Sequence, residues 1–344
     1  MLVLVLAFVA GAAFWLAGRG DDLDRRLEEQ LLRRGDVLVV GVSPDELPAL
    51  EGTRWRTGEL NAVLDAPDRG ALAPALHEAG IDAVLVAAGP RVEDRDVPLR
   101  VALAAYQPME GLRGVYLSPS HALYERAVST DLGRSAEALP RIARRILEGH
   151  VPPPIARFPE PLRRIRNVEV MVLLRDGGRA RLWRSARGSS VARALVTATV
   201  VARQRWAERE GALGGPLQQR LPFLEVEVTL LEEDGTLAVA TPAFVERVFF
   251  EEHGVAYERP GAWRYLLPEA TRRAGAGSAV AAYRKLFTDN ALPPDSFGRP
   301  DLRFYRLVVT ELGVSPASAR RASDAGDGLA SDALLDAVAG DGVD

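Results

Sequence analysis

Short runs of branched apolar residues, alternating with helical stretches, constrain the first half of this chain most strongly. The segment DVLVVGVS, residues 36–43, is apolar between an aspartate and a Ser-Pro turn, which is typical of a buried strand. Helix-like stretches and two further apolar runs then alternate, at residues 71–80, 81–89, 98–106 and 112–119. The order strand, helix, strand, helix, strand predicts an α/β domain over residues 36–131 with a small, mainly parallel sheet.

The turn after the first strand lacks a phosphate-binding motif. Gly41 stands alone there, and neither G-x-G-x-x-G nor G-x-x-x-x-G-K follows it. The chain has no cysteine, and its four histidines are scattered, so neither thiolate chemistry nor a histidine-rich metal centre is indicated. We therefore predict no cofactor and no metal.

The first eighteen residues, 1–18, carry no charged side chain. As a helix they would span roughly 27 Å, close to the ~30 Å hydrocarbon core of a bilayer. Trp15 and a sharply polar flank follow the pattern of a membrane interface, so we predict a single-pass anchor in a bacterial cell membrane. A cleaved signal peptide and a buried first helix are the alternatives, but no positively charged side chain precedes the apolar run.

The residues after the apolar run bear on its orientation. Residues 19–35 are predicted to form a charged helical connector that contains five arginines. The positive-inside rule then favours a cytoplasmic position for the soluble part, although interleaved acidic residues leave the side open.

The overall charge argues against a general affinity for nucleic acid. The chain has 43 basic and 47 acidic residues, a net charge of −4. Lys285 is the single lysine, and this bias toward arginine, with abundant Ala, Gly and Leu, indicates a GC-rich bacterial genome rather than phosphate chemistry. We expect no nucleic-acid partner.

A second folded region of the α+β class is predicted over residues 132–313. Residues 132–151 favour an amphipathic helix, and the prolines of VPPPIARFPEP, residues 151–161, predict an extended linker. Further elements are predicted as a hairpin turning at 176–178, a strand at 221–235, a helix at 241–254, a hairpin turning at 260–261, a helix at 278–290 and a strand at 302–312. Residues 314–344 have the composition of a disordered tail.

The stretch WRSARGSSVARALVTAT, residues 183–199, contains the first candidate site. Gly188 precedes Ser189 and Ser190 at the start of a helical pattern, so one serine is expected to cap the helix. The rarer alternative is an anion held by the same backbone N–H groups, with Arg184 and Arg187 nearby. The motif G-x-S-x-G is not formed, so we assign no catalytic nucleophile.

Glu225 and Glu227 form the second candidate site. They lie at i, i+2 on one face of the predicted strand at 221–235, which places them about 7 Å apart. Such an acidic pair suits acid–base chemistry or a hard cation, but a solvated strand face is far commoner. His253 is interpreted as a histidine at a helix C-terminus rather than as a ligand.

Two resemblances add expectations. Residues 78–89 and 110–127 are similar to the soluble ends of bacterial polytopic membrane glycosyltransferase-like proteins, which implies an accessory domain beside a membrane. Residues 137–313 resemble the AMMECR domain, named after the Alport, midface hypoplasia and elliptocytosis chromosomal region. Three segments carry this resemblance: LPFLEVEVTLLEE, EEHGVAYERPGAWRYLLPEA and NALPPDSFGRPDLRFYRLVV.

The AMMECR resemblance implies an α+β fold and no transferable activity. Where that family carries its RGCIG signature, this chain has ARLWRSARGSS, residues 180–190, and the family's Asp-Pro-Arg-Phe stretch is missing as well. Whether the chain is an enzyme stays open. The leading hypothesis is a membrane-tethered, non-enzymatic binding or scaffold module for an unknown protein or glycan ligand. The alternative is an enzyme acting on an anionic or glycan-like substrate at the surface of the C-terminal domain.

Overall fold

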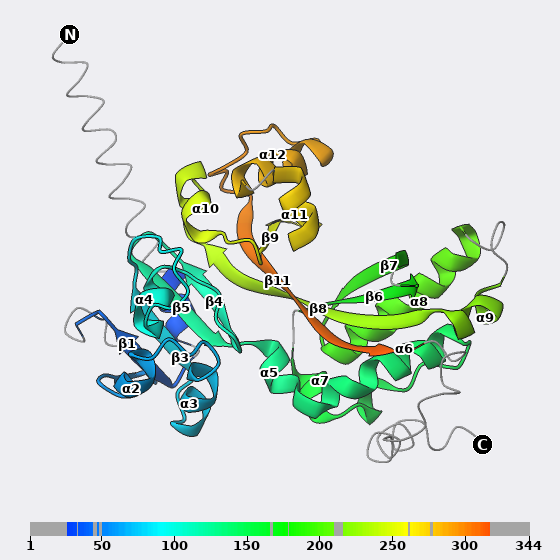
Figure 1. The fold of residues 1–344 in the computed structure, drawn as a ribbon, viewed down its shortest axis with the longest axis horizontal. Coiled ribbons are helices and arrows are strands. Elements are labelled where there is room, and N and C mark those ends of the chain that lie inside the picture. The colour runs from blue at the N-terminus through cyan, green and yellow to red at the C-terminus, as the bar shows by residue number, and fades with distance from the viewer. Residues whose placement is uncertain are drawn as a thin grey trace, which may run out of the picture. The chain divides into compact units, whose positions relative to one another are not determined.

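The computed structural model describes residues 26–316, apart from 33, 44–46, 48, 49, 166, 167, 178, 210–215, 261, 276 and 277. The fold is mixed α/β, and its strands belong to a large mixed sheet (Figure 1). The chain divides into two compact units. Unit 1 combines residues up to Ala127 with Glu233–Val308, and unit 2 combines Val128–Glu232 with the residues from Val309 onward.

The first part of unit 1 is an α/β arrangement. Its strands are β1 (Asp36–Val40), β2 (Arg54–Arg56), β3 (Ala83–Ala87), β4 (Leu112–Leu117) and β5 (His121–Arg126). Its helices include α2 (Asn61–Leu64), α3 (Leu72–Glu78) and α4 (Leu99–Ala104). Apolar runs and helical stretches therefore lie where the sequence predicts them.

In this part β1, β2, β3 and β4 run in one direction, as the sequence predicts, and the sheet is mixed because β5 runs the other way. The strand order is β2-β1-β3-β5-β4; β1 is parallel to β2 and β3, whereas β5 is antiparallel to both β3 and β4. The reason is the short turn between Leu117 and His121, since a tight turn can join only antiparallel strands. The strand β5 is not predicted from the sequence.

The second part of unit 1 joins helices to an antiparallel group of strands. Its elements are the end of β8 (Glu225–Leu237), α10 (Pro242–Val248), β9 (Gly254–Arg259), β10 (Ala262–Leu266), α11 (Pro268–Gly275), α12 (Ala279–Asp289) and the start of β11 (Arg303–Ser315). The predicted hairpin is confirmed as β9 and β10. Thr241 caps α10 and Ser278 caps α12, each with a side-chain oxygen that accepts a backbone N–H.

A shared core explains why residues 233–308 belong with the N-terminal segment. Leu38 of β1, Tyr124 of β5, Val255 of β9 and Phe304 of β11 are buried in the same apolar cluster. The end of β8 also pairs in parallel with β4. The units therefore divide the chain differently from the predicted consecutive domains at 36–131 and 132–313, because β8 and β11 each run from one unit into the other.

Unit 2 packs helices on one face of a strand group. Its elements are α5 (Val128–Leu132), α6 (Leu139–Leu147), α7 (Glu160–Arg164), β6 (Val168–Asp176), β7 (Arg179–Gly188), α8 (Val191–Arg209), α9 (Leu217–Arg220), short 3-10 turns at 133–138, 155–157 and 221–223, and the first part of β8. The predicted hairpin is confirmed as β6 and β7, and the strand order in this part of the sheet is β7-β6-β8 (Figure 1).

The proline-rich segment at 151–161 is part of unit 2 and does not form the predicted extended linker. It contains a 3-10 turn at Ile155–Arg157 and leads into α7, which has Pro161 in its first turn, where a helix tolerates proline. Phe158 and Leu162 are buried in the same core as α8. Pro159 and Pro161 lie at the start of α7, so this segment forms a packed corner rather than a linker between two domains.

Candidate functional site

Ser190 lies at the N-terminus of α8, as the sequence predicts. Its Oγ accepts a hydrogen bond from the N–H of Arg193 at 3.2 Å, and its carbonyl accepts the N–H of Ala194 at 2.9 Å. Ser190 is buried, whereas Ser189 is exposed. The capping interpretation is therefore confirmed for Ser190.

Gly188 permits the end of β7 to lie directly on the first turn of α8. A Cβ atom at this position would lie 2.7 Å from the backbone N of Ala194, which is closer than a real contact allows. The need for glycine here comes from this close approach and not from a left-handed backbone conformation.

Strand register separates the two arginines of the predicted anion site. Arg184 is paired with Val172, and Arg187 with Glu169. Because side chains alternate between the faces of a strand, residues 184 and 187 leave β7 on opposite faces. The Nη1 of Arg184 donates to the carbonyl of Trp183 at 2.7 Å. The local backbone therefore builds a cap, and it directs the two guanidinium groups to different faces.

Glu227 is not on a solvated strand face, which corrects the commoner of the two sequence interpretations. It is buried, and its carboxylate accepts hydrogen bonds from Arg175 Nε and, at 3.2 Å, from Thr229 Oγ1. The hydrogen bond to Glu227 raises the pKa of Arg175 above its ordinary value. Glu225 is paired with Arg175 across the strands. Glu225 and Glu227 therefore lie beside the guanidinium group of Arg175, which takes the place that a bound cation would have.

The acidic pair also lies well away from Arg187 along the sheet. Glu227 is opposite Leu173, which is opposite Trp183 on β7. Arg187 is four residues further along that strand, a separation of about 13 Å at ~3.3 Å per residue. The predicted site residues of unit 2 are therefore spread over two faces and along the strands.

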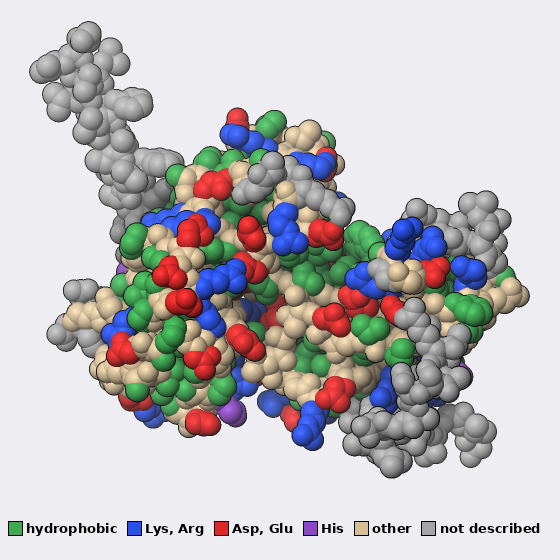
Figure 2. All heavy atoms as spheres, viewed as in Figure 1, with side chains coloured by type: hydrophobic (Ala, Val, Ile, Leu, Met, Phe, Trp, Pro, Cys, Tyr) green, Lys and Arg blue, Asp and Glu red, His purple; other side chains and the backbone are tan. Residues whose placement is uncertain are grey.

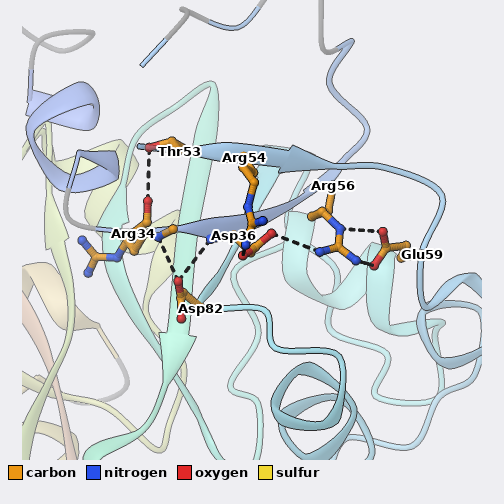
Figure 3. Close-up of polar contacts among 8 residues, drawn as sticks. Arg34, Asp36, Thr53, Arg54, Arg56, Glu59 and Asp82 are labelled. Carbon is orange, nitrogen blue, oxygen red and sulfur yellow. Dashed lines mark hydrogen bonds and ion pairs between the residues drawn. The ribbon is translucent and has the colours of Figure 1, made fainter. Parts of the chain in front are cut away.

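A polar network joins the amino-terminal ends of β1 and β3 (Figure 3). Asp82 Oδ2 accepts the backbone N–H groups of Gly35 at 2.8 Å and Asp36 at 3.1 Å. Asp36 in turn accepts hydrogen bonds from Arg54 and Arg56, which lower its pKa. Ligands of open α/β sheets bind at the opposite, carboxyl-terminal ends of the strands, so we assign this network to holding β2 beside β1.

The carboxyl-terminal end of β3 leads into a cavity of about 1010 Å³ within unit 1. One wall is the loop that follows β3, from Arg91 to Asp96. The other wall runs from Glu246 in α10 to His253, just before β9. The carboxyl-terminal ends of parallel strands are the usual ligand position in α/β sheets, and β3 is parallel to β1.

A buried glutamine fixes the first wall. The Nε2 of Gln107 donates to the carbonyls of Val92 at 2.5 Å and Asp94 at 2.9 Å. Its Oε1 accepts a hydrogen bond from Arg69, whose Nη2 also donates to the carbonyl of Arg95 at 3.0 Å. The loop therefore keeps its shape through bonds to its backbone, and its own side chains are left to face the cavity.

Arg91 links the first wall to the second. Its Nη1 donates to the carbonyls of Glu246 and, at 2.9 Å, of Phe249, at the C-terminal end of α10. Its guanidinium carbon lies 4.6 Å from the ring centroid of Phe250. Helix C-termini carry unsatisfied carbonyls and partial negative charge, so a guanidinium group is stabilising there.

The base of the second wall is a buried charged network of Arg306, Asp234 and His253. Asp234 Oδ2 lies 2.7 Å from Arg306 Nη2 and 2.9 Å from His253 Nε2, and its Oδ1 accepts the N–H of Gly114 at 2.5 Å. The N–H of Phe250 donates to His253 Nδ1 at 3.0 Å. Both ring nitrogens of His253 therefore face partners inside the protein.

Burial and charge set the ionisation of this network. The charge of Arg306 and the contact with His253 hold the pKa of Asp234 well below its usual range, although burial alone would raise it. Burial, and then the charge of Arg306, lower the pKa of His253. The arrangement is an ionised Asp–Arg pair beside a neutral histidine. His253 lies beyond the end of α10, so its interpretation as a helix C-terminal histidine is wrong.

The side chains that line the cavity carry both signs of charge. The arginines are Arg69, Arg91, Arg95 and Arg272. The acidic residues are Glu93, Asp96, Glu246, Glu251 and Glu252. Over the face shown in Figure 2, acidic and basic side chains are likewise interspersed. The cavity is therefore polar and nearly balanced in charge.

This cavity is not predicted from the sequence. Its two walls come from segments about 150 residues apart, and Arg91 bonds to a carbonyl 155 positions away. Two local signals were present: the charged loop RVEDRDVP directly after a predicted strand, and the segment FFEEHG, rich in aromatic and charged residues, at the end of a predicted helix. The rule that ligands bind at carboxyl ends of parallel strands points to the first of these.

Within the described residues, no three His, Asp or Glu side chains are grouped to hold a metal ion. In the same part of the chain, no helix is long and apolar enough to cross a membrane. The predicted anchor at 1–18 lies outside the described residues. The same holds for the predicted tail beyond residue 316, while its first residues, up to Ser315, belong to β11.

Comparisons with known proteins give no family. No protein-family model and no curated protein matches the chain. Among solved structures, the chain is similar to the crystal structure of an uncharacterized protein from Pyrococcus horikoshii. The sequence identity is 19% and the TM-score 0.39, with 51% of this chain and 89% of that chain covered. We draw no assignment from this likeness.

Proposed function

We propose that this protein is a membrane-tethered, non-enzymatic binding module that holds a small polar ligand in the cavity of unit 1. The observation that carries the proposal is the way this cavity is built. Buried Gln107 and the carbonyl-bound arginines Arg69 and Arg91 fix its two walls. Its volume of about 1010 Å³ suits a ligand of ordinary metabolite size.

The state of His253 favours binding over catalysis. A general base needs a ring nitrogen within hydrogen-bond reach of the substrate. In His253 the Nε2 lies 2.9 Å from Asp234 Oδ2, the Nδ1 accepts the N–H of Phe250, and the side chain is fully buried. The residue therefore contributes to the wall without offering a free ring nitrogen to a ligand.

The alternative of an enzyme site in unit 2 requires its candidate side chains to converge. Arg184 and Arg187 leave opposite faces of β7, and Glu227 is bound by Arg175. This geometry offers that alternative no support. The resemblance of residues 137–313 to the AMMECR domain stays a proposal, and it implies no activity for the cavity.

Thermal-shift screening of the purified full chain against polar metabolites tests ligand binding. We expect at least one compound to raise the melting temperature by a few degrees, because ligand linkage stabilises the folded state. Pro67→Trp at the cavity rim should abolish that shift, while the control Pro294→Trp, at another exposed proline, should keep it. A shift that survives Pro67→Trp would place the ligand elsewhere. Incubation of the same hits with the protein, followed by mass spectrometry, should show no conversion.

Cell fractionation tests the tether. The full chain should sediment with membranes, and a version that starts at Asp21 should be recovered in the soluble fraction. Equal recovery of both versions in the soluble fraction would contradict the anchor at residues 1–18.

A further inference from the structure

Two groups of charged side chains in the cavity differ in how firmly the protein holds them. Arg69, Arg91 and Glu246 are bound to the chain itself: the arginines donate to backbone carbonyls, and Glu246 accepts hydrogen bonds from the Ser278 hydroxyl and the Val280 N–H. These groups hold the walls and cannot be released without loosening them. They are therefore poor candidates for ligand recognition.

Arg95 and Glu252 belong to the second group. They form an ion pair that bridges the two walls, since Arg95 lies in the loop after β3 and Glu252 lies between α10 and β9. The Arg95 side chain is 74% exposed and that of Glu252 37% exposed. Ion pairs this exposed contribute little to stability, so this pair can open at low cost.

We propose that the Arg95–Glu252 pair is the recognition element of the cavity and that the ligand is dipolar, carrying one carboxylate or similar anion and one ammonium group. This inference rests on the proposed binding function. The ligand's anion would take the place of Glu252 at Arg95, and its ammonium group would take the place of Arg95 at Glu252. One ion pair is thereby exchanged for two, and each charge keeps a charge-assisted hydrogen bond.

The remaining lining residues favour a dipolar ligand over a singly charged one. Arg272 and Glu251 add a second cation and a second anion, with Arg272 Nη1 3.5 Å from the Glu251 carbonyl. A simple anion would meet the acidic residues of both walls, and a simple cation would meet the arginines. Phe249 and Phe250 supply the apolar surface against which the body of such a ligand can pack.

Isothermal titration of the full chain tests this inference. The probes are the twenty free amino acids and the dipeptide alanyl-alanine, each compared with its N-acetyl and its C-terminal amide derivative. We expect at least one zwitterion to bind, and both of its derivatives to bind roughly tenfold to a hundredfold more weakly, because each lacks one charge-assisted hydrogen bond.

Matched variants locate the interaction. Arg95→Gln and Glu252→Gln should each weaken binding of the zwitterion by roughly tenfold or more and leave the melting temperature unchanged. The control Arg284→Gln breaks an exposed ion pair with Asp295 outside the cavity and should leave the affinity unchanged.

The outcomes separate this inference from the proposed function. Derivatives that bind as tightly as the parent zwitterion, and lose binding in Pro67→Trp, would overturn the dipolar ligand while leaving the cavity as a binding site. Undiminished binding by both Arg95→Gln and Glu252→Gln would overturn the role of the ion pair. If no zwitterion and no derivative binds, the inference fails. If the metabolite screen is also negative, the proposed function fails with it.

Discussion

Asp234→Asn should be among the most destabilising conservative substitutions in unit 1. The change keeps the shape of the side chain and removes the carboxylate that lies 2.7 Å from the fully buried Arg306. Arg306 would keep its hydrogen bonds to the carbonyls of Tyr106, Val248 and residue 234, but its charge would lack a counter-ion. Removing one partner of a buried pair costs about 3–5 kcal/mol.

Urea unfolding followed by circular dichroism measures this cost. For a unit of about 200 residues, 3–5 kcal/mol corresponds to a fall in melting temperature of roughly 6–20 °C. Hydrogen-exchange mass spectrometry should show faster exchange in peptides from β9 and β11, whose strands lie beside the network. The control Asp295→Asn, at an exposed ion pair with Arg284, should change the free energy of unfolding by less than about 0.5 kcal/mol.

A double variant distinguishes the loss of a counter-ion from a general packing defect. Asp234→Leu combined with Arg306→Met removes both charges, so its cost should be smaller than the sum of the two single costs. If Asp234→Asn costs less than about 1 kcal/mol, or if the double variant is fully additive, the buried pair does not act as we describe.

Three further predictions concern stability. Burial lowers the pKa of His253, so below about pH 6.5 the unfolded state takes up a proton that the folded state does not. The free energy of unfolding therefore falls as the pH falls, by up to about 1.4 kcal/mol per pH unit. Between pH 7 and 5.5 the melting temperature of His253→Gln should fall less than that of the unchanged protein, and an equal fall would contradict this. Ser190→Ala should cost about 1 kcal/mol in chemical denaturation through loss of the α8 cap, while Ser189→Ala should stay within about 0.5 kcal/mol; equal effects would refute the assignment of the cap to Ser190. Gly188→Ala should cost about 1–3 kcal/mol, because its Cβ would lie 2.7 Å from the Ala194 nitrogen, and a neutral result in the same assay would show that β7 and α8 can move apart.

Local patterns in the sequence determined individual strands and helix caps. The alternation in β6 placed Val168, Val170, Val172 and Leu174 on one face, and all four are buried in the core of unit 2. The Ser-Ser at the start of α8 gave the cap, because capping depends only on the three residues that follow it. Such signals survive in the sequence because their physical cause acts over a few residues.

Strand pairing depended on the tertiary structure. Ala122, Leu123 and Tyr124 of β5 are all buried, but this apolar run is only three residues long and is flanked by polar residues, so it is too short to identify a strand. Without β5, the strands β3 and β4 were expected to be parallel neighbours. The same limit applies to Glu227, whose burial follows from Arg175 on the adjacent strand and not from its own segment.

The candidate site was decided entirely by contacts between distant parts of the chain. Arg91 and Arg306 are two arginines among many in the sequence, and only the fold brings them to the carbonyls at the end of α10. His253 was interpreted as a histidine at a helix C-terminus, but it is a buried group because Asp234 of β8 meets its Nε2. A guanidinium or imidazole group takes its role from what surrounds it, and residues far away in the sequence provide those surroundings.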